Sequence, residues 1–290
     1  MDPSTGHGFV PTQRNDTYPF IDPLKSNFAD QNVLITGSAR GLGKQMALSY
    51  AKAGASGIAL LDILDAEPVR SEILEAAKTA GHPEPKFISV KVDVTSEQSV
   101  TEAFKTVSAK FDSLDFVINN AGTLAGYIPL VKSEPSKWWR DWEVNVKGPY
   151  LISRAFMPLV LKGKQKTFVV VSSVGAHFTL PGGSAYESSK LAVLKLNYYL
   201  NVEHESDGVL AYAIAPGGVF TAMASTFPVE LHDRLTDTPY MVADTLVFLT
   251  RERREWLANR YIDSRWDMEE LMAKKEEIVQ KDLLKVRMAL

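Results

Sequence analysis

The feature that most constrains the fold of this chain is a regular alternation of short β-branched runs with longer stretches of helical period, which starts at Asn32. Runs such as FVVVSS and VLITG lack a polar face, as buried parallel strands do. The alternation predicts an α/β fold, a doubly wound parallel sheet of about seven strands with helices on both faces. The expected strands are residues 32–36, 57–62, 86–93, 115–120, 167–173, 209–216 and, more weakly, 260–264. The expected helices are residues 42–53, 67–80, 96–111, 135–162, 184–206 and 239–250.

The length of 290 residues allows one large domain or two ordinary ones. No repeat, Gly/Ser linker or charge block separates two halves, so we expect a single domain over residues 31–265. Residues 1–30 are rich in proline and predict an irregular arm, which Tyr18 and Phe20 pin to the body. Residues 266–290 predict a helical tail, packed on the body or on a partner subunit.

Composition and charge exclude several classes of function. The chain has 32 Lys and Arg against 35 Asp and Glu, whereas nucleic-acid proteins carry a strong basic excess. It contains no cysteine, which removes disulfides, thiolate nucleophiles and iron–sulfur clusters. No HExxH or similar spacing of His, Asp and Glu indicates a metal site. No secretory signal or membrane-spanning run is visible, so we expect a cytoplasmic protein without membrane or nucleic-acid partners.

A glycine-rich turn directly follows the first expected strand. It reads TGSARGLG, with Gly37, Gly41 and Gly43, and an apolar helical stretch comes after it. Glycines let the backbone turn sharply and approach a pyrophosphate, whose charge then lies at the positive end of the next helix. The spacing GxxxGxG differs from the usual GxGxxG, and a P-loop is excluded because Gln45 stands where that motif needs Ser or Thr. The turn therefore predicts a dinucleotide site.

Two residues near this turn favour different dinucleotides. Asp62 closes the second strand, where its carboxylate can accept hydrogen bonds from both hydroxyls of an adenosine ribose, as in NAD. Arg40 lies inside the turn, where its guanidinium can meet the 2′-phosphate of NADP. Because a carboxylate repels a phosphate at short range, Asp62 outweighs Arg40. We therefore expect NAD(H) to be favoured over NADP(H).

A second group of residues has the chemistry to move a proton. Tyr186 and Lys190 stand four apart in a helical stretch, so both project from one helix face. Ser173 ends the strand TFVVVSS, and enzymes with parallel sheets gather their chemistry at such strand ends. A free phenol titrates at about 10, roughly three units too high for a catalyst at neutral pH. The Lys190 ammonium and a nicotinamide cation can supply the downward shift of the Tyr186 pKa.

With these motifs in order over residues 32–221, the chain resembles the short-chain dehydrogenase/reductase family, in its compact single-domain Rossmann branch, and fungal members in particular. TGSARGLG is similar to the family's TGxxxGxG, residues 119–122 match its NNAG, and PGGVFT is similar to its PGxVxT. The resemblance implies a catalytic tetrad of Ser173, Tyr186, Lys190 and Asn145. It implies cofactor binding by Thr36, Gly37, Ser38, Arg40, Gly41, Leu42, Gly43, Asp62, Asp93, Val94, Asn120, Ala121, Gly122, Tyr186, Lys190, Pro216, Gly217, Val219 and Thr221.

The resemblance also implies a role for each member of the tetrad. Tyr186 is the general acid or base toward the substrate oxygen, and Ser173 holds that oxygen by a hydrogen bond. Lys190 lowers the tyrosine pKa and binds the nicotinamide ribose, while Asn145 keeps a water that links Lys190 to solvent. The residues implied to wrap the nicotinamide carboxamide are Gly217, Val219 and Thr221.

The segments that follow the motifs are expected to line the substrate pocket. They are residues 124–127, 174–178, 181–183 and 220–227, which are mostly apolar, aromatic or small. His177 is either a hydrogen-bond partner of the substrate or a plain wall residue. We expect an NAD(P)-dependent oxidoreductase that interconverts a secondary alcohol and a ketone on a hydrophobic, cyclic, polyketide- or terpenoid-like molecule of specialised metabolism. The alternatives are a non-redox cyclase or isomerase and a catalytically silent cofactor-binding sensor.

Assembly is also expected from the resemblance. The family commonly pairs through two long helices, here residues 135–162 and 184–206, which implies a homodimer or a homotetramer. The family's glycine-rich final segment is missing, and the chain reads WLANRYIDSRWDMEE in its place. The last strand and the tail are therefore expected to pack differently from those of the family, which leaves two or four chains open.

Overall fold

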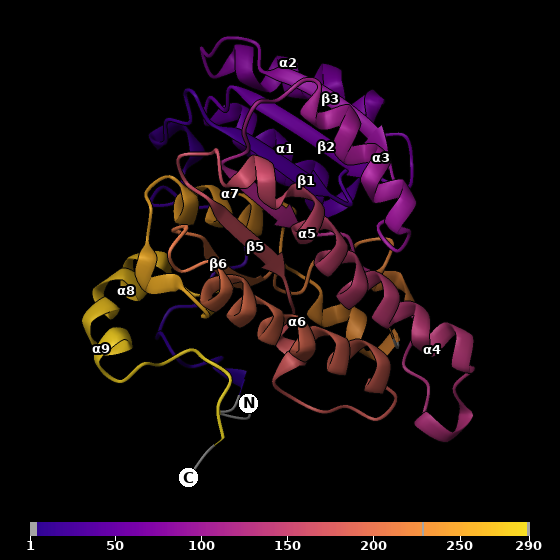
Figure 1. Cartoon of the computed structure of the whole chain (residues 1–290). Helices are drawn as coiled ribbons and strands as arrows, with labels where there is room; N and C mark the ends of the chain where they lie inside the picture. The colour runs from indigo at the N-terminus through magenta and orange to yellow at the C-terminus, as the bar shows by residue number, and fades with distance from the viewer. Residues whose placement is uncertain (1–4, 228, 289–290) are drawn as a thin grey trace.

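The computed structural model describes residues 5–227 and 229–288, and a parallel sheet forms its centre (Figure 1). The strand order is β3-β2-β1-β4-β5-β6-β7, and each neighbouring pair runs parallel. This confirms the doubly wound sheet. The strands are β1 (Asn32–Thr36), β2 (Gly57–Asp62), β3 (Lys86–Lys91), β4 (Phe116–Asn119), β5 (Thr167–Val171), β6 (Leu210–Ala215) and β7 (Tyr261–Asp263). From β3 onward they end one or two residues earlier than predicted, because their last residues already turn into the loops at the carboxyl edge.

Helices cover both faces of the sheet. One face carries α1 (Gly41–Lys52), α2 (Arg70–Thr79) and α7 (Pro239–Thr250). The other carries α3 (Glu97–Ser108), α5 (Gly148–Val160) and α6 (Ser184–Glu203), with α4 (Pro135–Trp142) at its outer end (Figure 1).

The prediction of one continuous helix over residues 135–162 is wrong, because the helical stretch is interrupted. A π-helical turn, Glu143–Lys147, separates α4 from α5. Pro149 has no backbone N–H to donate to the carbonyl four residues earlier, so regular α-helical bonding is interrupted there. The turn contains Asn145, and such turns are frequent at functional sites.

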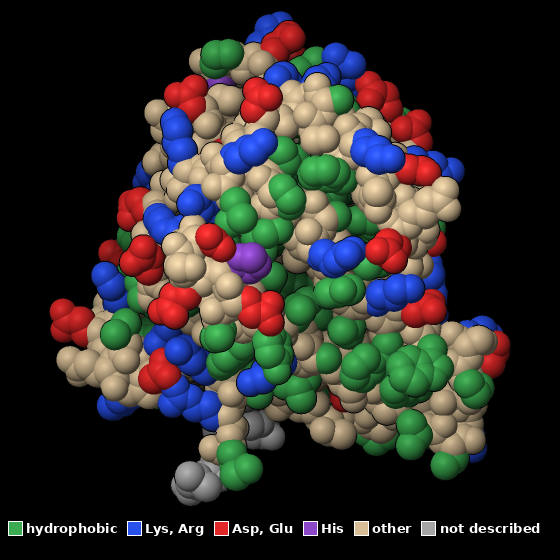
Figure 2. Space-filling view, in the orientation of Figure 1, with side chains coloured by type: hydrophobic (Ala, Val, Ile, Leu, Met, Phe, Trp, Pro, Cys, Tyr) green, Lys and Arg blue, Asp and Glu red, His purple; other side chains and the backbone are tan. Residues whose placement is uncertain are grey.

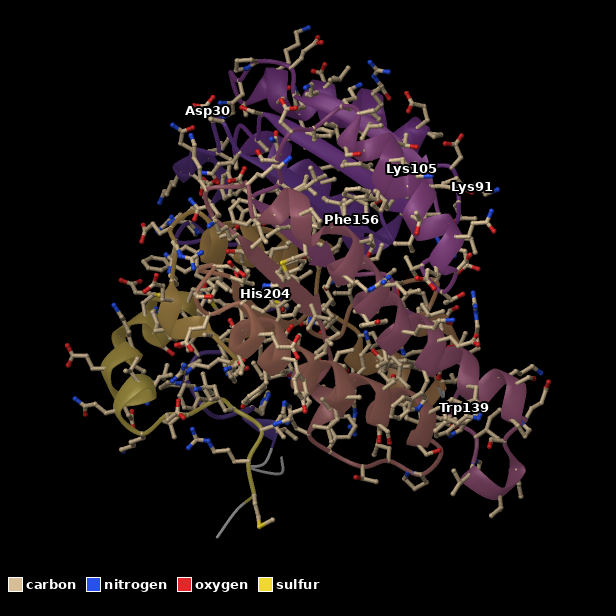
Figure 3. The ribbon with its side chains drawn as sticks, in the orientation of Figure 1. Asp30, Lys91, Lys105, Trp139, Phe156 and His204 are labelled. Carbon is tan, nitrogen blue, oxygen red and sulfur yellow. The ribbon has the colours of Figure 1, made fainter. Side chains whose placement is uncertain are left out.

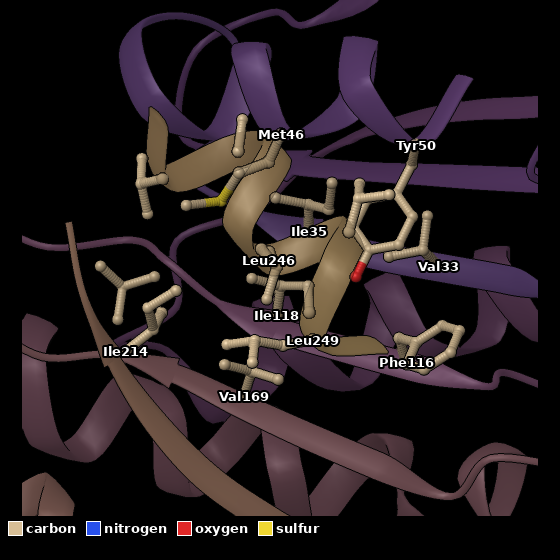
Figure 4. Packing of buried hydrophobic residues seen from close by; sticks show 14 of the residues in the cluster. Val33, Ile35, Met46, Tyr50, Phe116, Ile118, Val169, Ile214, Leu246 and Leu249 are labelled. Carbon is tan, nitrogen blue, oxygen red and sulfur yellow. The ribbon is translucent and has the colours of Figure 1, made fainter. Parts of the chain in front are cut away.

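The apolar core fixes the carboxyl edge of the sheet in space. Met46 and Tyr50 of α1 and Leu246 of α7 are fully buried against strand residues such as Ile35 and Ile118 (Figure 4). On the opposite face, Phe156 of α5 is fully buried and its ring packs edge-on against Phe104, with ring centroids 5.7 Å apart (Figure 3). Burying one such side chain stabilises the fold by about 1.5–3 kcal/mol.

The arm and the tail pack against each other and against the body. The Tyr18 hydroxyl accepts the N–H of Met268 at 2.6 Å, and Phe20 packs on Phe248. Tyr18 and Phe20 therefore attach the arm to the tail and to the body of the protein, as expected. The fully buried Trp266 donates to the carbonyl of Gly6. The tail forms two short helices, α8 (Met268–Ala273) and α9 (Lys275–Gln280). The division into a domain over residues 31–265 with an arm and a tail stays a prediction.

Candidate active site

A cavity of about 1180 Å³ runs along the carboxyl edge of the sheet. Most residues expected to bind cofactor or to act on substrate line it: Gly37, Arg40, Gly41, Leu42, Asp62, Asp93, Val94, Asn120, Ala121, Gly122, Ser173, Tyr186, Lys190, Pro216, Gly217, Val219 and Thr221. The carboxyl ends of the first six strands, or the loops and the helix after them, contribute to this set. The fold therefore brings residues from across the chain to one site.

Four expected site residues lie behind the cavity wall and support it. The Thr36 hydroxyl accepts the N–H groups of Asn120 and Ala121, both at 3.0 Å. The Ser38 hydroxyl donates to the carbonyl of Leu61. The other two are Gly43 and Asn145, and their contacts are described below.

The glycine turn has the backbone conformation that its sequence predicts. Gly37 and Gly41 have φ angles of +66° and +58°, in the left-handed region that favours glycine. Gly43 is required for a different reason, because a Cβ placed there would lie 2.2 Å from the carbonyl oxygen of Gly37. The side-chain amide of Asn120 donates to the carbonyls of Thr36 and Gly37, both at 2.9 Å. The turn is thus locked against the loop that follows β4.

At the end of the cavity where the adenosine is expected, Asp62 and Arg40 differ in how firmly they are held. Asp62 is buried, and its two carboxylate oxygens accept the N–H groups of Ala39 at 2.8 Å and Leu64 at 2.9 Å. Arg40 is exposed, and its side chain makes no hydrogen bond or ion pair with any residue of the described ranges 5–227 and 229–288. A fixed carboxylate and a solvent-exposed guanidinium therefore share this end of the site.

Asp93 and Arg140 form a second polar group at this end. The Asp93 carboxylate accepts the N–H and the hydroxyl of Thr95, at 2.9 and 2.7 Å. Arg140 donates to the Thr95 hydroxyl and lies 4.0 Å from Asp93. Partial burial raises the pKa of Asp93, but the hydrogen bonds from Thr95 and the charges of Arg140 and Lys147 outweigh it, so its pKa is lowered.

The centre of the cavity holds Ser173, Tyr186 and Lys190. Tyr186 and Lys190 project from α6 into the buried side of the site. The Ser173 hydroxyl accepts the N–H of Gly175 at 3.1 Å and lies near enough to the Tyr186 hydroxyl to lower its pKa. The Lys190 ammonium donates to the carbonyl of Val171 at 2.9 Å and lies 5.6 Å from the Tyr186 ring centroid. The spacing seen in the sequence therefore produces one compact cluster.

The protein environment moves the pKa values of this cluster in directions that the sequence does not reveal. Burial raises the pKa of Tyr186 to about 12, the hydrogen bond with Ser173 lowers it, and the charges of Asp141 and Glu187 raise it. Burial lowers the pKa of Lys190 to about 8. The downward shift expected for Tyr186 is not present in the protein alone, because burial is the largest effect. The positive charge of a bound nicotinamide would lower this pKa.

Asn145 organises the neighbouring backbone. Its side-chain oxygen accepts the N–H of Thr123 at 2.9 Å, and its amide donates to the Thr123 carbonyl and the Ser189 hydroxyl, both at 3.0 Å. A Cβ on Gly122 would lie 3.3 Å from the Asn145 oxygen and 3.4 Å from the Lys190 nitrogen, so these groups meet around Gly122. The expected water between Lys190 and solvent stays a prediction.

Comparison with known proteins identifies the family. Residues 31–230 match the family model of the short chain dehydrogenases. The chain belongs to the short-chain dehydrogenase family. It is similar to short chain dehydrogenase mpl6 of Monascus purpureus, with 45% identity over 99% of both chains, which confirms the resemblance to fungal members. A 3-ketoacyl-(acyl-carrier-protein) reductase of Brucella melitensis, solved with NADH, is 26% identical with a TM-score of 0.71, covering 81% of this chain and 96% of that one. A short chain dehydrogenase of Shigella flexneri, solved with NADP, is 25% identical with a TM-score of 0.71, covering 84% and 100%.

Members of this family are NAD(P)-dependent oxidoreductases, and this chain is one of them. The relatives solved with NADH and with NADP leave the preferred dinucleotide open. In the described part of the chain, no group of three His, Cys, Asp or Glu side chains is placed to hold a metal ion. Among the same residues, none of the helices has the length and apolar character that a membrane crossing needs.

The part of this dehydrogenase expected to receive the substrate differs in detail from the sequence prediction. Of the predicted segments, the residues that line the cavity are Tyr127, Val174, Phe178, Phe220, Thr221, Ala222, Met223, Ala224 and Phe227. Leu180 lines it, whereas residues 181–183 do not. His177 does not line the cavity. Its ring packs edge-on against Tyr261, with ring centroids 4.5 Å apart, which favours a structural role over contact with the substrate. Tyr127 and Phe227 pack edge-on at 5.5 Å.

Sequence reasoning missed three groups at the dehydrogenase site. Thr5 and His7 of the arm reach the cavity, as does Arg265 after β7, and no local pattern announces contacts so distant along the chain. Glu187, next to Tyr186, is buried and accepts the N–H of Leu180 at 3.1 Å, which holds the loop that carries Leu180. Asp141 of α4 is also buried beside the tetrad. In the sequence it stands in WWRDWE and looks like an ordinary charged residue on a helix surface.

Proposed function

We propose that this dehydrogenase interconverts a secondary alcohol and a ketone on a hydrophobic, cyclic small molecule, with Tyr186 as the general acid or base. The observation that carries the proposal is the buried cluster of Ser173, Tyr186 and Lys190, which opens onto an apolar and aromatic wall. A phenol beside a serine hydroxyl is suited to exchange a proton with a substrate oxygen.

The chain's own residues account for the proton side of the reaction. NAD(P) supplies or accepts the hydride when bound, at the residues that line the cavity from Gly37 to Thr221. In the reductive direction, Tyr186 gives its proton to the carbonyl oxygen, and the Ser173 hydroxyl keeps that oxygen in place. The Lys190 ammonium, at 5.6 Å from the tyrosine ring, stabilises the phenolate left behind.

The substrate class follows from the cavity wall. Tyr127, Phe178, Leu180 and Phe227 present aromatic and aliphatic surface, which favours a ring system without charged groups. The 45% identity to a short chain dehydrogenase of Monascus purpureus supports a place in fungal specialised metabolism, with polyketide- or terpenoid-like substrates. The cytoplasmic location expected from the sequence stays a prediction.

An assay with the purified protein tests this function. Cyclic ketones and secondary alcohols are screened with both dinucleotides while the absorbance of the reduced nicotinamide is followed. We expect substrate-dependent oxidation or reduction of the nicotinamide. If the protein binds a dinucleotide but never changes its redox state across the screen, while it converts a substrate without net redox change, the non-redox cyclase or isomerase reading is supported. Dinucleotide binding with no conversion of any compound supports the silent sensor.

We infer further that NAD(H) is favoured over NADP(H). Asp62 is held at the ribose end by the N–H groups of Ala39 and Leu64, so it cannot swing away from a 2′-phosphate without breaking both bonds. Asp62→Asn keeps the shape and removes the charge, and we expect the ratio of NADH to NADPH affinity to fall by about tenfold. Fluorescence titration of both dinucleotides measures the ratio, with Arg40→Ala as the contrasting variant. Tighter NADPH binding by the unmodified protein, lost in Arg40→Ala, would overturn the preference.

We also infer that the protein forms a homodimer or homotetramer through α4, α5 and α6. Hydrophobic side chains gather over these helices (Figure 2), including the exposed Tyr150, Leu191, Tyr199 and Val202. Trp139, midway along α4, is 59% exposed (Figure 3). Exposed apolar surface of this kind marks contact sites. Sedimentation equilibrium should give the mass of two or four chains, and Leu191→Asp should lower it to one.

A further inference from the structure

Asp141 is a buried carboxyl that the proposed mechanism does not use. Its side chain lies on α4, one helical turn before Asn145, and the residue is 0% exposed. One carboxyl oxygen accepts the N–H of Ala125 at 3.2 Å, and the other has no hydrogen-bond partner among the described residues. Burying a carboxyl with a single backbone donor is unfavourable unless an opposite charge compensates it.

The position of Asp141 relates it to the catalytic cluster. Asn145 binds Thr123, and Asp141 binds Ala125, so one face of this helical segment holds the loop after β4 at two points. Gly122, at the start of the same loop, lies against both the Asn145 oxygen and the Lys190 nitrogen. The buried Asp141 carboxyl and the buried Lys190 ammonium therefore lie against the same short loop, at Ala125 and Gly122.

The charged and titratable groups that act on this carboxyl are few. Lys190 from α6 is the one whose charge favours the ionised carboxyl, and burial opposes it, so the Asp141 pKa is raised to about 6. Asp141 in turn favours the charged form of Lys190, against the burial that lowers the lysine pKa to about 8. From α6, Tyr186 and Glu187 also face the cluster, and the Asp141 and Glu187 charges both raise the tyrosine pKa. On its own helix, Arg140 binds Thr95 at the other end of the cavity.

We propose that Asp141 is the counter-ion of Lys190, a positioning residue that keeps the catalytic lysine charged. The inference rests on the proposed function, because it concerns the lysine that stabilises the Tyr186 phenolate. The two groups act on each other through space, since the Lys190 ammonium donates its hydrogen bond to the Val171 carbonyl and the Asp141 carboxyl accepts its hydrogen bond from the N–H of Ala125. In a buried site, a charge interaction persists beyond direct contact.

A change in pH dependence is the expected consequence. Lys190 has to be charged for carbonyl reduction, so the rate falls as pH rises past the lysine pKa. Without the carboxylate, the ammonium loses its proton more easily. In Asp141→Asn the alkaline fall of kcat/KM should therefore move to lower pH by about one unit. The asparagine keeps an oxygen for the N–H of Ala125, so the loop is still held.

The experiment compares kcat/KM for reduction across pH in the unmodified protein, Asp141→Asn and Asp141→Ser, a smaller uncharged variant. Asp244→Asn is the matched control. Asp244 is a buried aspartate of α7, on the opposite face of the sheet, that accepts the hydroxyls of Ser49 and Thr17 at 2.6 Å. Its variant should lose thermal stability without moving the alkaline fall.

Binding of the reduced dinucleotide gives a second readout that needs no turnover. If Lys190 holds the nicotinamide ribose, affinity measured by fluorescence should weaken at high pH, and about one unit earlier in Asp141→Asn. If kcat/KM fell at the same alkaline pH in all the proteins, the counter-ion role of Asp141 would be overturned. The proposed function would still stand in that case, provided that Tyr186→Phe is inactive. Turnover that survives Tyr186→Phe would instead show that the proposed function itself is wrong.

Discussion

Replacing Tyr186 with phenylalanine is expected to lower kcat for carbonyl reduction by roughly a thousandfold, the contribution of a positioned general acid. The change removes only the phenolic hydroxyl, which lies beside Ser173. The ring stays buried in α6, and the Lys190 ammonium keeps its bond to the Val171 carbonyl at 2.9 Å. Dinucleotide affinity should therefore change by less than about threefold, a difference of well under 1 kcal/mol. Initial rates and fluorescence titration measure the two effects.

Tyr199→Phe is the matched control for this variant. Tyr199 lies on the same helix α6 and is 54% exposed, so its hydroxyl can be removed without touching the cavity. We expect its kcat to equal that of the unmodified protein. If Tyr186→Phe retained turnover within a factor of about ten, the loss would be too small for a general acid, and another group would have to carry the proton.

The pKa of Tyr186 makes its role in oxidation depend on the bound dinucleotide as well as on the protein. With its pKa raised to about 12, Tyr186 is fully protonated at neutral pH, which suits it to donate a proton in reduction. For alcohol oxidation the phenol has to lose its proton first, and the positive nicotinamide is then the charge that assists this. Oxidation is therefore expected to need a higher pH than reduction.

Periodicity predicted the architecture well because it reflects burial directly. Strands such as Thr167–Val171 are buried on both faces and read as unbroken apolar runs in the sequence. Tyr186 and Lys190 were recognisable because helix geometry fixes their relation four residues apart. In each case, the structure at that point is determined by residues close along the chain.

Features that depend on distant residues could not be predicted. Asp141 is buried only because α4 packs beside α6 and the loop after β4, which no spacing in WWRDWE reveals. The arm reaches the cavity through Thr5 and His7 because Trp266 and the tail hold it there. The direction of the Tyr186 pKa shift depends on total burial, a property of the assembled fold.

Gly43→Ala is expected to have the second large effect, on both folding and dinucleotide binding. A Cβ at this position would lie 2.2 Å from the Gly37 carbonyl oxygen and 2.6 Å from the Asn120 amide nitrogen. Neither atom can retreat easily, because Gly37 is backbone and the Asn120 amide is bonded to the carbonyls of Thr36 and Gly37. The turn has to open, at a cost of about 2–4 kcal/mol in the free energy of unfolding. Opening it also moves the N–H groups that would bind pyrophosphate, so affinity should fall by roughly a hundredfold or more.

Alanine variants of two other glycines serve as controls, because neither places a Cβ in steric overlap with a neighbour. Gly41 has φ +58° but no atom closer than 3.9 Å to an added Cβ, so Gly41→Ala should cost only about 1–2 kcal/mol from the left-handed backbone. Gly8 has nothing within 4 Å of an added Cβ, and Gly8→Ala should leave stability and binding unchanged. Chemical denaturation and dinucleotide titration should therefore show the largest loss of stability and affinity in Gly43→Ala, a smaller loss in Gly41→Ala and none in Gly8→Ala. If Gly43→Ala were no worse than Gly41→Ala, the turn would be able to relax around a methyl group, and close approach to Gly37 would not be the reason for glycine at this position.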